Sequence, residues 1–139
     1  MFDYDDDEVE IRQREKPSLD AVLKALASKD GNLLSADIYY GLSGLSSEEI
    51  DRIRPIWRGL DDERRRKLMR QVADLSEADF ELDYGALGLF ALDDPDAEVR
   101  QAAIDTLWID NSVAFMSRLI DMAKTDQSDT VRAAAMSEL

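Results

Sequence analysis

The stretch ALDDPDAEVRQAA at residues 91–103 recurs 32 residues later, without a gap, as AKTDQSDTVRAAA at residues 123–135. Repetition at a fixed period is typical of proteins in which similar supersecondary units stack on one another. Six positions are identical in the two copies: Ala91, Asp94, Val99, Arg100, Ala102 and Ala103 recur as Ala123, Asp126, Val131, Arg132, Ala134 and Ala135. We therefore interpret the rest of the chain outward from this repeat.

The start of each repeated helix can be predicted from residue chemistry. Asp96 and Ser128 precede the helical patterns, and their side-chain oxygens are suited to accept hydrogen bonds from the first backbone N–H groups. Val99 and Val131 then fall on the buried side of the two helices. The Ala pair that follows in each copy is small enough to let neighbouring helices approach closely.

The repeated arginines, Arg100 and Arg132, need a different explanation. Each lies near the start of its helix, where the positive end of the helix dipole disfavours a cation. We therefore expect each guanidinium to form an ion pair with an Asp of an adjacent turn.

These two copies resemble the HEAT-repeat family. The residues that carry the resemblance are Asp94-Pro95-Asp96-x-x-Val99-Arg100-x-x-Ala103 and Asp126-x-Ser128-x-x-Val131-Arg132-x-x-Ala135. The second copy has Gln127 in place of Pro95, and the specific match covers residues 84–139. The resemblance implies an all-α fold, a right-handed superhelical α-solenoid of stacked antiparallel helix pairs whose second helices line the concave side. It also implies a binding role without catalytic residues.

Extended outward, the helical pattern predicts four pairs, at residues 19–43, 47–75, 83–108 and 112–139. Ser18 is suited to cap the first helix, and Gly31-Asn32 to end it. The residues from Ser46 to Glu49 form a capping box, and Pro55 predicts a kink in the helix that follows. Period-two alternation is absent, so no strand is expected.

The helix over Arg64–Leu75 is interpreted as a degenerate second helix of an earlier unit. In that interpretation Leu68 replaces the repeated Val, and Asp61-Asp62 replace the Asp-Pro turn. Residues 17–139 then form a single helical domain.

The first 16 residues are expected to be an acidic, mobile arm, because carboxylates at this density repel one another and bury nothing. Asp3, Asp5 and Asp7 match the first three positions of a calcium-binding loop. However, Glu8 stands where that loop needs Gly, and Arg14 where it needs Glu. We therefore expect no calcium site here.

Composition restricts the function further. The 139 residues carry a formal net charge of -14, which disfavours nucleic acid and anionic membranes and suits a basic protein partner. The chain has no Cys, no secretory signal pattern and no apolar run long enough for a membrane helix, so we expect a cytoplasmic protein that does not enter membranes. It also has no His, the commonest general acid or base.

Five cations in seven residues follow Glu63, and the candidate partner surface is Arg64, Arg65, Arg66 and Arg70. One interpretation is a phosphate-contacting patch, as in HEAT-like DNA glycosylases. The interpretation we favour is a solvated helix face neutralised by the carboxylates at residues 61–63, because the cations point round most of the helix and the whole chain is acidic.

The aromatic and clustered acidic residues are interpreted structurally. Trp57 and Trp108 are either exposed anchors of an interface or core residues, and we favour core positions because both lie on apolar helix faces. Tyr39 is expected to be partly buried and Tyr40 exposed, or the reverse. Turn formation and capping explain the carboxylates of residues 93–96, so we expect no catalytic, metal or cofactor site.

The sequence therefore predicts a non-catalytic protein–protein interaction scaffold or adaptor. The main alternative is a HEAT-like nucleic-acid-binding or base-excision module that uses the cluster from Arg64 to Arg70. A bilin-attaching enzyme is a third possibility, which no residue specifically supports. The last helix reaches Leu139 without a Gly or Asn cap, so we expect either a longer chain or association through this C-terminal edge.

Overall fold

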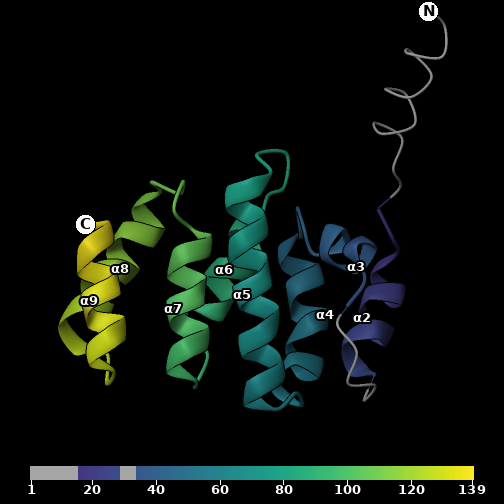
Figure 1. Cartoon of the computed structure of the whole chain (residues 1–139), viewed down its shortest axis with the longest axis horizontal. Helices are drawn as coiled ribbons and strands as arrows, with labels where there is room; N and C mark the ends of the chain where they lie inside the picture. Colours follow the sequence, from purple (N-terminus) through teal and green to yellow (C-terminus); the bar gives the residue numbers. More distant parts are fainter. Residues whose placement is uncertain (1–15, 29–33) are drawn as a thin grey trace, which may run out of the picture.

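The computed structural model describes residues 16–28 and 34–139, and every regular element in these residues is an α-helix. The predicted acidic arm lies outside the described residues except for Lys16, as do the calcium-loop positions and the helix break at Gly31-Asn32. Figure 1 shows the helices following one another along the length of the molecule. The helices are α2 (Leu19–Ala27), α3 (Ala36–Gly41), α4 (Ser47–Arg58), α5 (Asp62–Ala78), α6 (Gly85–Ala91), α7 (Ala97–Thr106), α8 (Val113–Thr125) and α9 (Asp129–Glu138).

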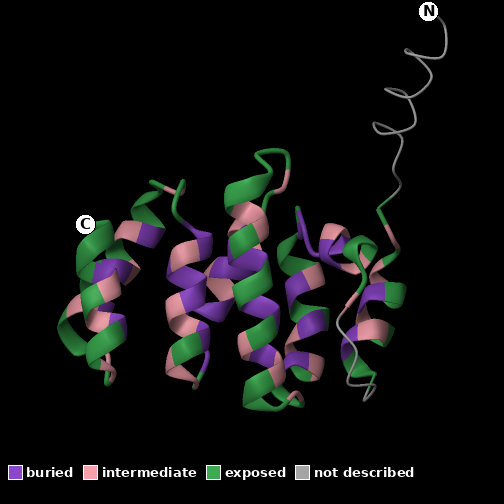
Figure 2. Ribbon diagram, viewed as in Figure 1, coloured by how far each residue is buried: buried purple, intermediate pink, exposed green. Residues whose placement is uncertain are grey.

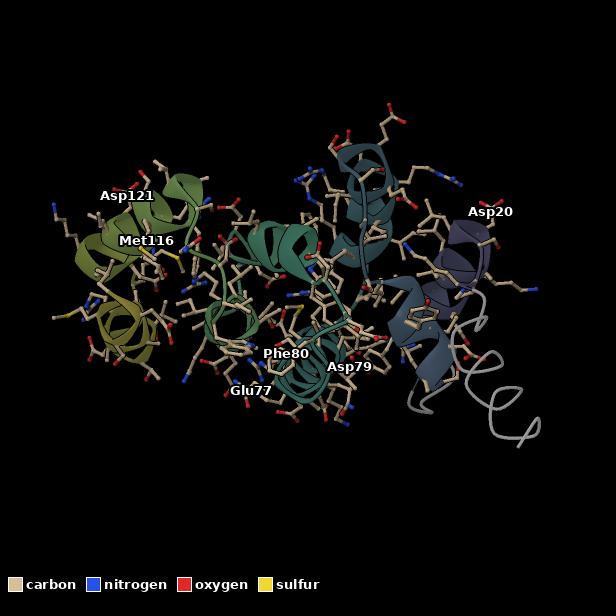
Figure 3. All side chains as sticks on the ribbon, turned by 90° about the horizontal axis from the view of Figure 1, so that it is seen from above. Asp20, Glu77, Asp79, Phe80, Met116 and Asp121 are labelled. Atoms are coloured by element: carbon tan, nitrogen blue, oxygen red, sulfur yellow. The ribbon has the colours of Figure 1, made fainter. Side chains whose placement is uncertain are left out.

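The helices lie in two rows, which are seen from above in Figure 3. In one row, α2 packs on α4 and α4 on α6; in the other, α5 packs on α7 and α7 on α9. Contacts of α2 with α3, α6 with α7 and α8 with α9 join the rows. Consecutive helices therefore alternate between the rows, and the core lies between them.

Side-chain caps begin these helices, with α6 as the exception. The capping box is present at α4: the Glu49 backbone N–H donates to the Ser46 hydroxyl at 3.1 Å, and the Ser46 N–H donates to the Glu49 carboxylate at 3.0 Å. Asp96 and Ser128 cap α7 and α9 as predicted. Pro55 lies inside α4, which continues through it to Arg58.

The repeat produces the same buried position twice. Val99 and Val131 are both completely buried, each three residues after the cap of its helix. Ala103 and Ala135, four residues further on, are also completely buried. Figure 2 shows such buried positions alternating with exposed ones along the helices, as expected for helices with one face in a shared core.

Two glycines are required by close approach or by backbone conformation. A Cβ atom on Gly88 would lie 2.8 Å from Leu107 Cδ2, so this glycine lets α6 approach the end of α7. Gly44, in the connection before α4, has a φ of 65°, a region that residues with a side chain rarely adopt.

Within the described residues, no helix is long and apolar enough to cross a bilayer.

Candidate functional site

The arginines expected on a partner surface are held largely by contacts within the molecule. The Arg65 side chain is only 6% exposed, and its Nε donates to Asp94 Oδ2 at 3.0 Å. It also donates to Asp62 Oδ1 at 2.5 Å and to the Leu60 carbonyl. Burial opposes the charge of Arg65, but the hydrogen bonds to Asp94 and Asp62 outweigh it and raise the pKa of the guanidinium. The expectation that Arg65 lies on the surface is therefore wrong.

Asp94 is the buried centre of this contact. Its carboxylate is 1% exposed and accepts a second hydrogen bond from Trp57 Nε1 at 2.8 Å. Its other oxygen accepts from the Asp96 backbone N–H at 2.9 Å. Asp94 thus joins α4, α5 and the turn before α7, which goes beyond the turn-forming role predicted for it.

The other arginines of the run are partly exposed but also have protein partners. Arg66 binds Asp96 through two hydrogen bonds, of 2.9 and 2.6 Å, and these raise its pKa. Arg70 pairs with Asp105 at 2.8 Å, and Arg64 donates to the Ala25 carbonyl at 3.3 Å. Arg65, Arg66 and Arg70 therefore bind carboxylates of α7 and of the turn before it, so the neutralising groups include Asp94, Asp96 and Asp105 in addition to the predicted residues 61–63.

The same geometry recurs at the repeated arginines. Arg100 binds Asp126 through two hydrogen bonds of 2.9 Å, and its NH1 group donates to the Asp94 carbonyl at 2.9 Å. Arg132 donates to the Asp126 carbonyl at 2.5 Å and pairs with Asp129. The ion pair predicted for Arg100 with an Asp of the adjacent turn is confirmed.

This geometry also corrects the register of the earlier unit. Arg65, Arg100 and Arg132 each stand four residues after a cap, and each donates to a carbonyl of the preceding turn. Leu68 consequently corresponds to Ala103 and Ala135, and does not replace the repeated Val.

One of the two tryptophans is placed differently from expectation. Trp57 is 3% exposed and lies in the core, as predicted. Trp108 is 39% exposed, and its ring lies 6.1 Å from that of Phe80, which is 78% exposed. The prediction of a core position for Trp108 is therefore wrong.

The exposed aromatic pair belongs to an apolar ridge, which we define as Phe80, Trp108, Ile109 and Val113. Ile109 is 69% exposed and Val113 is 86% exposed. Phe80 lies in the α5–α6 connection, and Trp108 and Ile109 lie in the α7–α8 connection; both connections are at the upper edge in Figure 1. The ridge was not singled out from the sequence, although an aromatic residue within the acidic connection EADFELD, residues 77–83, is a signal that could have indicated it.

A cleft lies beside the ridge, between α3 and the C-terminal half of α5. Its volume is about 430 Å³. We call it the tyrosine cleft, and its lining residues are Leu34, Ala36, Tyr39, Tyr40, Gln71, Leu75, Asp79, Glu81, Leu82 and Tyr84.

The floor of the tyrosine cleft is held in place by an interhelical hydrogen bond. Tyr39 and Tyr84 are buried, and the Tyr84 hydroxyl donates to the Tyr39 carbonyl at 2.7 Å. Burial raises the pKa of both phenols above the ordinary value of 10.0, at which a tyrosine is already neutral at physiological pH. Tyr40 is half-buried, so one tyrosine of the 39–40 pair is buried, but the other is not fully exposed.

The rim of the tyrosine cleft is acidic. Asp79 and Glu81 are exposed, and the Glu81 N–H donates to Asp79 Oδ1 at 2.9 Å. Figure 3 shows Asp79 near Glu77 and Phe80 at this end of α5. Among the residues that the structure describes, no group of three or more carboxylates is placed to hold a metal ion.

Searches with the sequence and with the structure found no matching family model, no matching curated protein and no matching solved structure.

Proposed function

We propose that this chain is a non-catalytic scaffold or adaptor, built as a HEAT-like, right-handed superhelical α-solenoid of antiparallel helix pairs, that binds a protein partner. The two rows of helices and the repeated arginine contacts support the architectural part of the proposal. In a stacked array each unit buries its apolar face against the next. The contacts of Arg65 with Asp94 and of Arg100 with Asp126 cross between successive units in the way such stacking requires.

The observation that carries the binding part is the apolar ridge. Phe80 and Trp108 expose aromatic surface in contact with each other, and Ile109 and Val113, which follow Trp108 closely in the chain, are exposed as well. Exposed aromatic and aliphatic groups gathered together are typical of protein–protein interaction sites. The ridge supplies an anchor that a partner's apolar side chains can cover.

The charge around the ridge favours a basic protein partner. Arg100 is the sole Lys or Arg between residues 71 and 117, and its guanidinium binds Asp126. Exposed carboxylates on the α5–α6 connection border the ridge. A partner that carries cations around an apolar centre would complement both features.

The ion pairs of α5 remove the main support for the nucleic-acid alternative. Phosphate binding needs cations that can replace counterions. Arg65, Arg66 and Arg70 are already paired with carboxylates of the next unit.

A cytoplasmic location remains part of our proposal. Association through the C-terminal edge, where Met136 and Leu139 are exposed, is a further part of it.

Site-specific photo-crosslinking in the native cell tests the binding function. A benzophenone amino acid at position 80 would report proteins that cover the ridge, and the same group at the exposed position Glu63 would serve as control. We expect one or a few discrete protein adducts at position 80 that are absent at position 63. Adducts to nucleic acid, or no protein adduct specific to position 80, would contradict the proposal.

A further inference from the structure

The α5–α6 connection presents different chemistry to its two sides. Phe80 contacts Trp108 on the ridge, whereas its neighbours Asp79 and Glu81 line the tyrosine cleft. A protein that covers the ridge would therefore also lie over the mouth of the cleft. The cleft is in the size range of natural binding sites, which are typically a few hundred Å³.

The interior of the cleft suits an apolar chain. Leu75 and Leu82 are half-buried, and the rings of Tyr39 and Tyr84 are fixed by burial and by the hydrogen bond between their helices. Little ordering of these groups is needed when a ligand enters, because they are already packed. An aliphatic stem could lie along this surface.

The rim of the cleft suits a cation. Among the described residues, no Lys or Arg pairs with Asp79 or Glu81, and none lines the cleft. Asp79 lies close enough to Tyr84 that its charge raises the pKa of that phenol, after the larger contributions of burial and of Tyr39. The carboxylates of the rim are therefore available to an incoming positive group.

We propose that the tyrosine cleft binds a lysine or arginine side chain from an extended, basic segment of the protein that covers the ridge. The alkyl stem lies on Leu75 and Leu82, as long cationic side chains do on apolar surfaces. The charged head reaches Asp79 and Glu81 through charge-assisted hydrogen bonds. This inference rests on the proposed function and adds the chemistry of the partner.

Peptide binding measured by fluorescence anisotropy tests the cleft directly. The probe is a fluorescein-labelled octapeptide in which lysine and leucine alternate, and the comparison peptide has glutamate in place of lysine. We expect the lysine peptide to bind and the glutamate peptide to bind at least tenfold more weakly. Equal binding of the two peptides would overturn the proposal.

Variants separate the cleft from general attraction to an acidic protein. Asp79→Lys with Glu81→Lys should weaken binding at least tenfold. Asp74→Lys with Glu77→Lys makes the same change in net charge at exposed positions of α5 outside the cleft, and should weaken binding less than threefold. Ala36→Trp, which fills the cleft without changing the charge, should also weaken binding at least tenfold. Equal weakening by the two double variants, or no effect of Ala36→Trp, would overturn the proposal.

Two further measurements identify what has failed. If lysine amide binds as tightly as the peptide, the cleft takes a small amine and the peptide proposal is overturned. If adducts still form at position 80 but the peptide does not bind, the cleft proposal fails and the scaffold function stands. If no adduct forms at position 80 while the peptide binds the cleft as described, the ridge fails as the partner site, and with it the partner named in the proposal.

Discussion

At the scale of single residues, Asp94 connects three parts of the fold through one buried carboxylate. It accepts from Trp57 of α4, from Arg65 of α5 and from the Asp96 backbone N–H. A buried charge of this kind is tolerated because each oxygen is hydrogen-bonded. Removing one member of a buried ion pair leaves the charge of the other buried and unpaired. The resulting loss of stability is far larger than the net stability that the intact pair contributes.

We expect Asp94→Asn to lower the free energy of unfolding by about 3 kcal/mol, because Arg65 would remain buried without its main counter-ion. The remaining pair with Asp62 keeps the loss near the lower end of the range for broken buried pairs. Urea denaturation followed by circular dichroism measures the change. Asp93→Asn is the control, since that exposed carboxylate pairs with Arg118 at the surface and should cost less than about 1 kcal/mol. Equal losses for the two variants would contradict this prediction.

A second prediction at this scale concerns acid stability. The hydrogen bonds from Arg66 lower the pKa of Asp96. At Asp126, burial raises the pKa, but the hydrogen bonds from Arg100 and from the Ser128 N–H lower it by more than burial raises it. Both values lie below the ordinary 3.8. The stability that such a group contributes is complete above its unfolded pKa and is lost as the pH falls through its folded pKa.

We therefore expect the free energy of unfolding to decline as the pH falls below about 4. Asp126→Asn should make the protein less stable at pH 7 and its decline toward pH 2 shallower, as measured by urea denaturation at a series of pH values. Asp74→Asn, at an exposed carboxylate, should leave the slope unchanged. An unchanged slope in Asp126→Asn would show that this ion pair does not contribute to the acid sensitivity.

At the scale of the elements, the contact between α6 and α7 depends on a missing side chain. A Cβ on Gly88 would lie 2.8 Å from Leu107 Cδ2 and 2.9 Å from Leu107 Cγ, and both residues are buried. We expect Gly88→Ala to lower the free energy of unfolding by about 1–3 kcal/mol through overpacking, in spite of the better helix propensity of Ala. Thermal or urea denaturation measures this.

Gly59→Ala is the matched control for that variant. Gly59 is the C-cap of α4 and has an ordinary negative φ, and a Cβ there would make only a 3.4 Å contact with the Ile56 carbonyl. We expect its stability to stay within about 0.5 kcal/mol of the unchanged protein. A Gly88→Ala protein as stable as Gly59→Ala would mean that α6 and α7 can separate without cost.

The elements also show how far the sequence could predict the structure. Caps such as Ser46 and Asp96 were predictable because their hydrogen bonds reach only three residues along the chain. Trp108 was misplaced because the helical period was carried past Thr106, where α7 ends and the period no longer determines which way a side chain faces. The end of α5 at Ala78, beyond the predicted residue 75, is an ordinary boundary error.

The candidate site was less predictable for a related reason. The partner of Arg65 lies 29 residues away, so the carboxylates beside it in sequence gave an incomplete account of its charge. The tyrosine cleft lies between the six-residue α3 and the seventeen-residue α5, and it is lined by residues from Leu34 to Tyr84. A space of this kind depends on how helices pack, and no local pattern encodes it.

At the scale of the whole molecule, packing between neighbouring helices has consequences for cooperativity. The helix α9 packs on α8 and α7. The main contacts of α4 are with α2 and α6, and those of α5 are with α7. In a stacked array, stability is approximately the sum of each unit and its contacts with the next unit. The end unit should therefore open at a lower free energy than the middle of the array.

Val131→Ala tests this expectation, because Val131 is completely buried in α9. We expect a local loss of roughly 2 kcal/mol. Hydrogen exchange of amides in α8 and α9 should therefore speed up roughly tenfold or more, while exchange in α4 and α5 stays unchanged. Val99→Ala removes the equivalent side chain from α7, between α5 and α9, and should speed up exchange in all three of these helices. If Val131→Ala instead speeds up exchange equally in α4, α5 and α9, the helices share one cooperative core and the stacked-repeat architecture is contradicted.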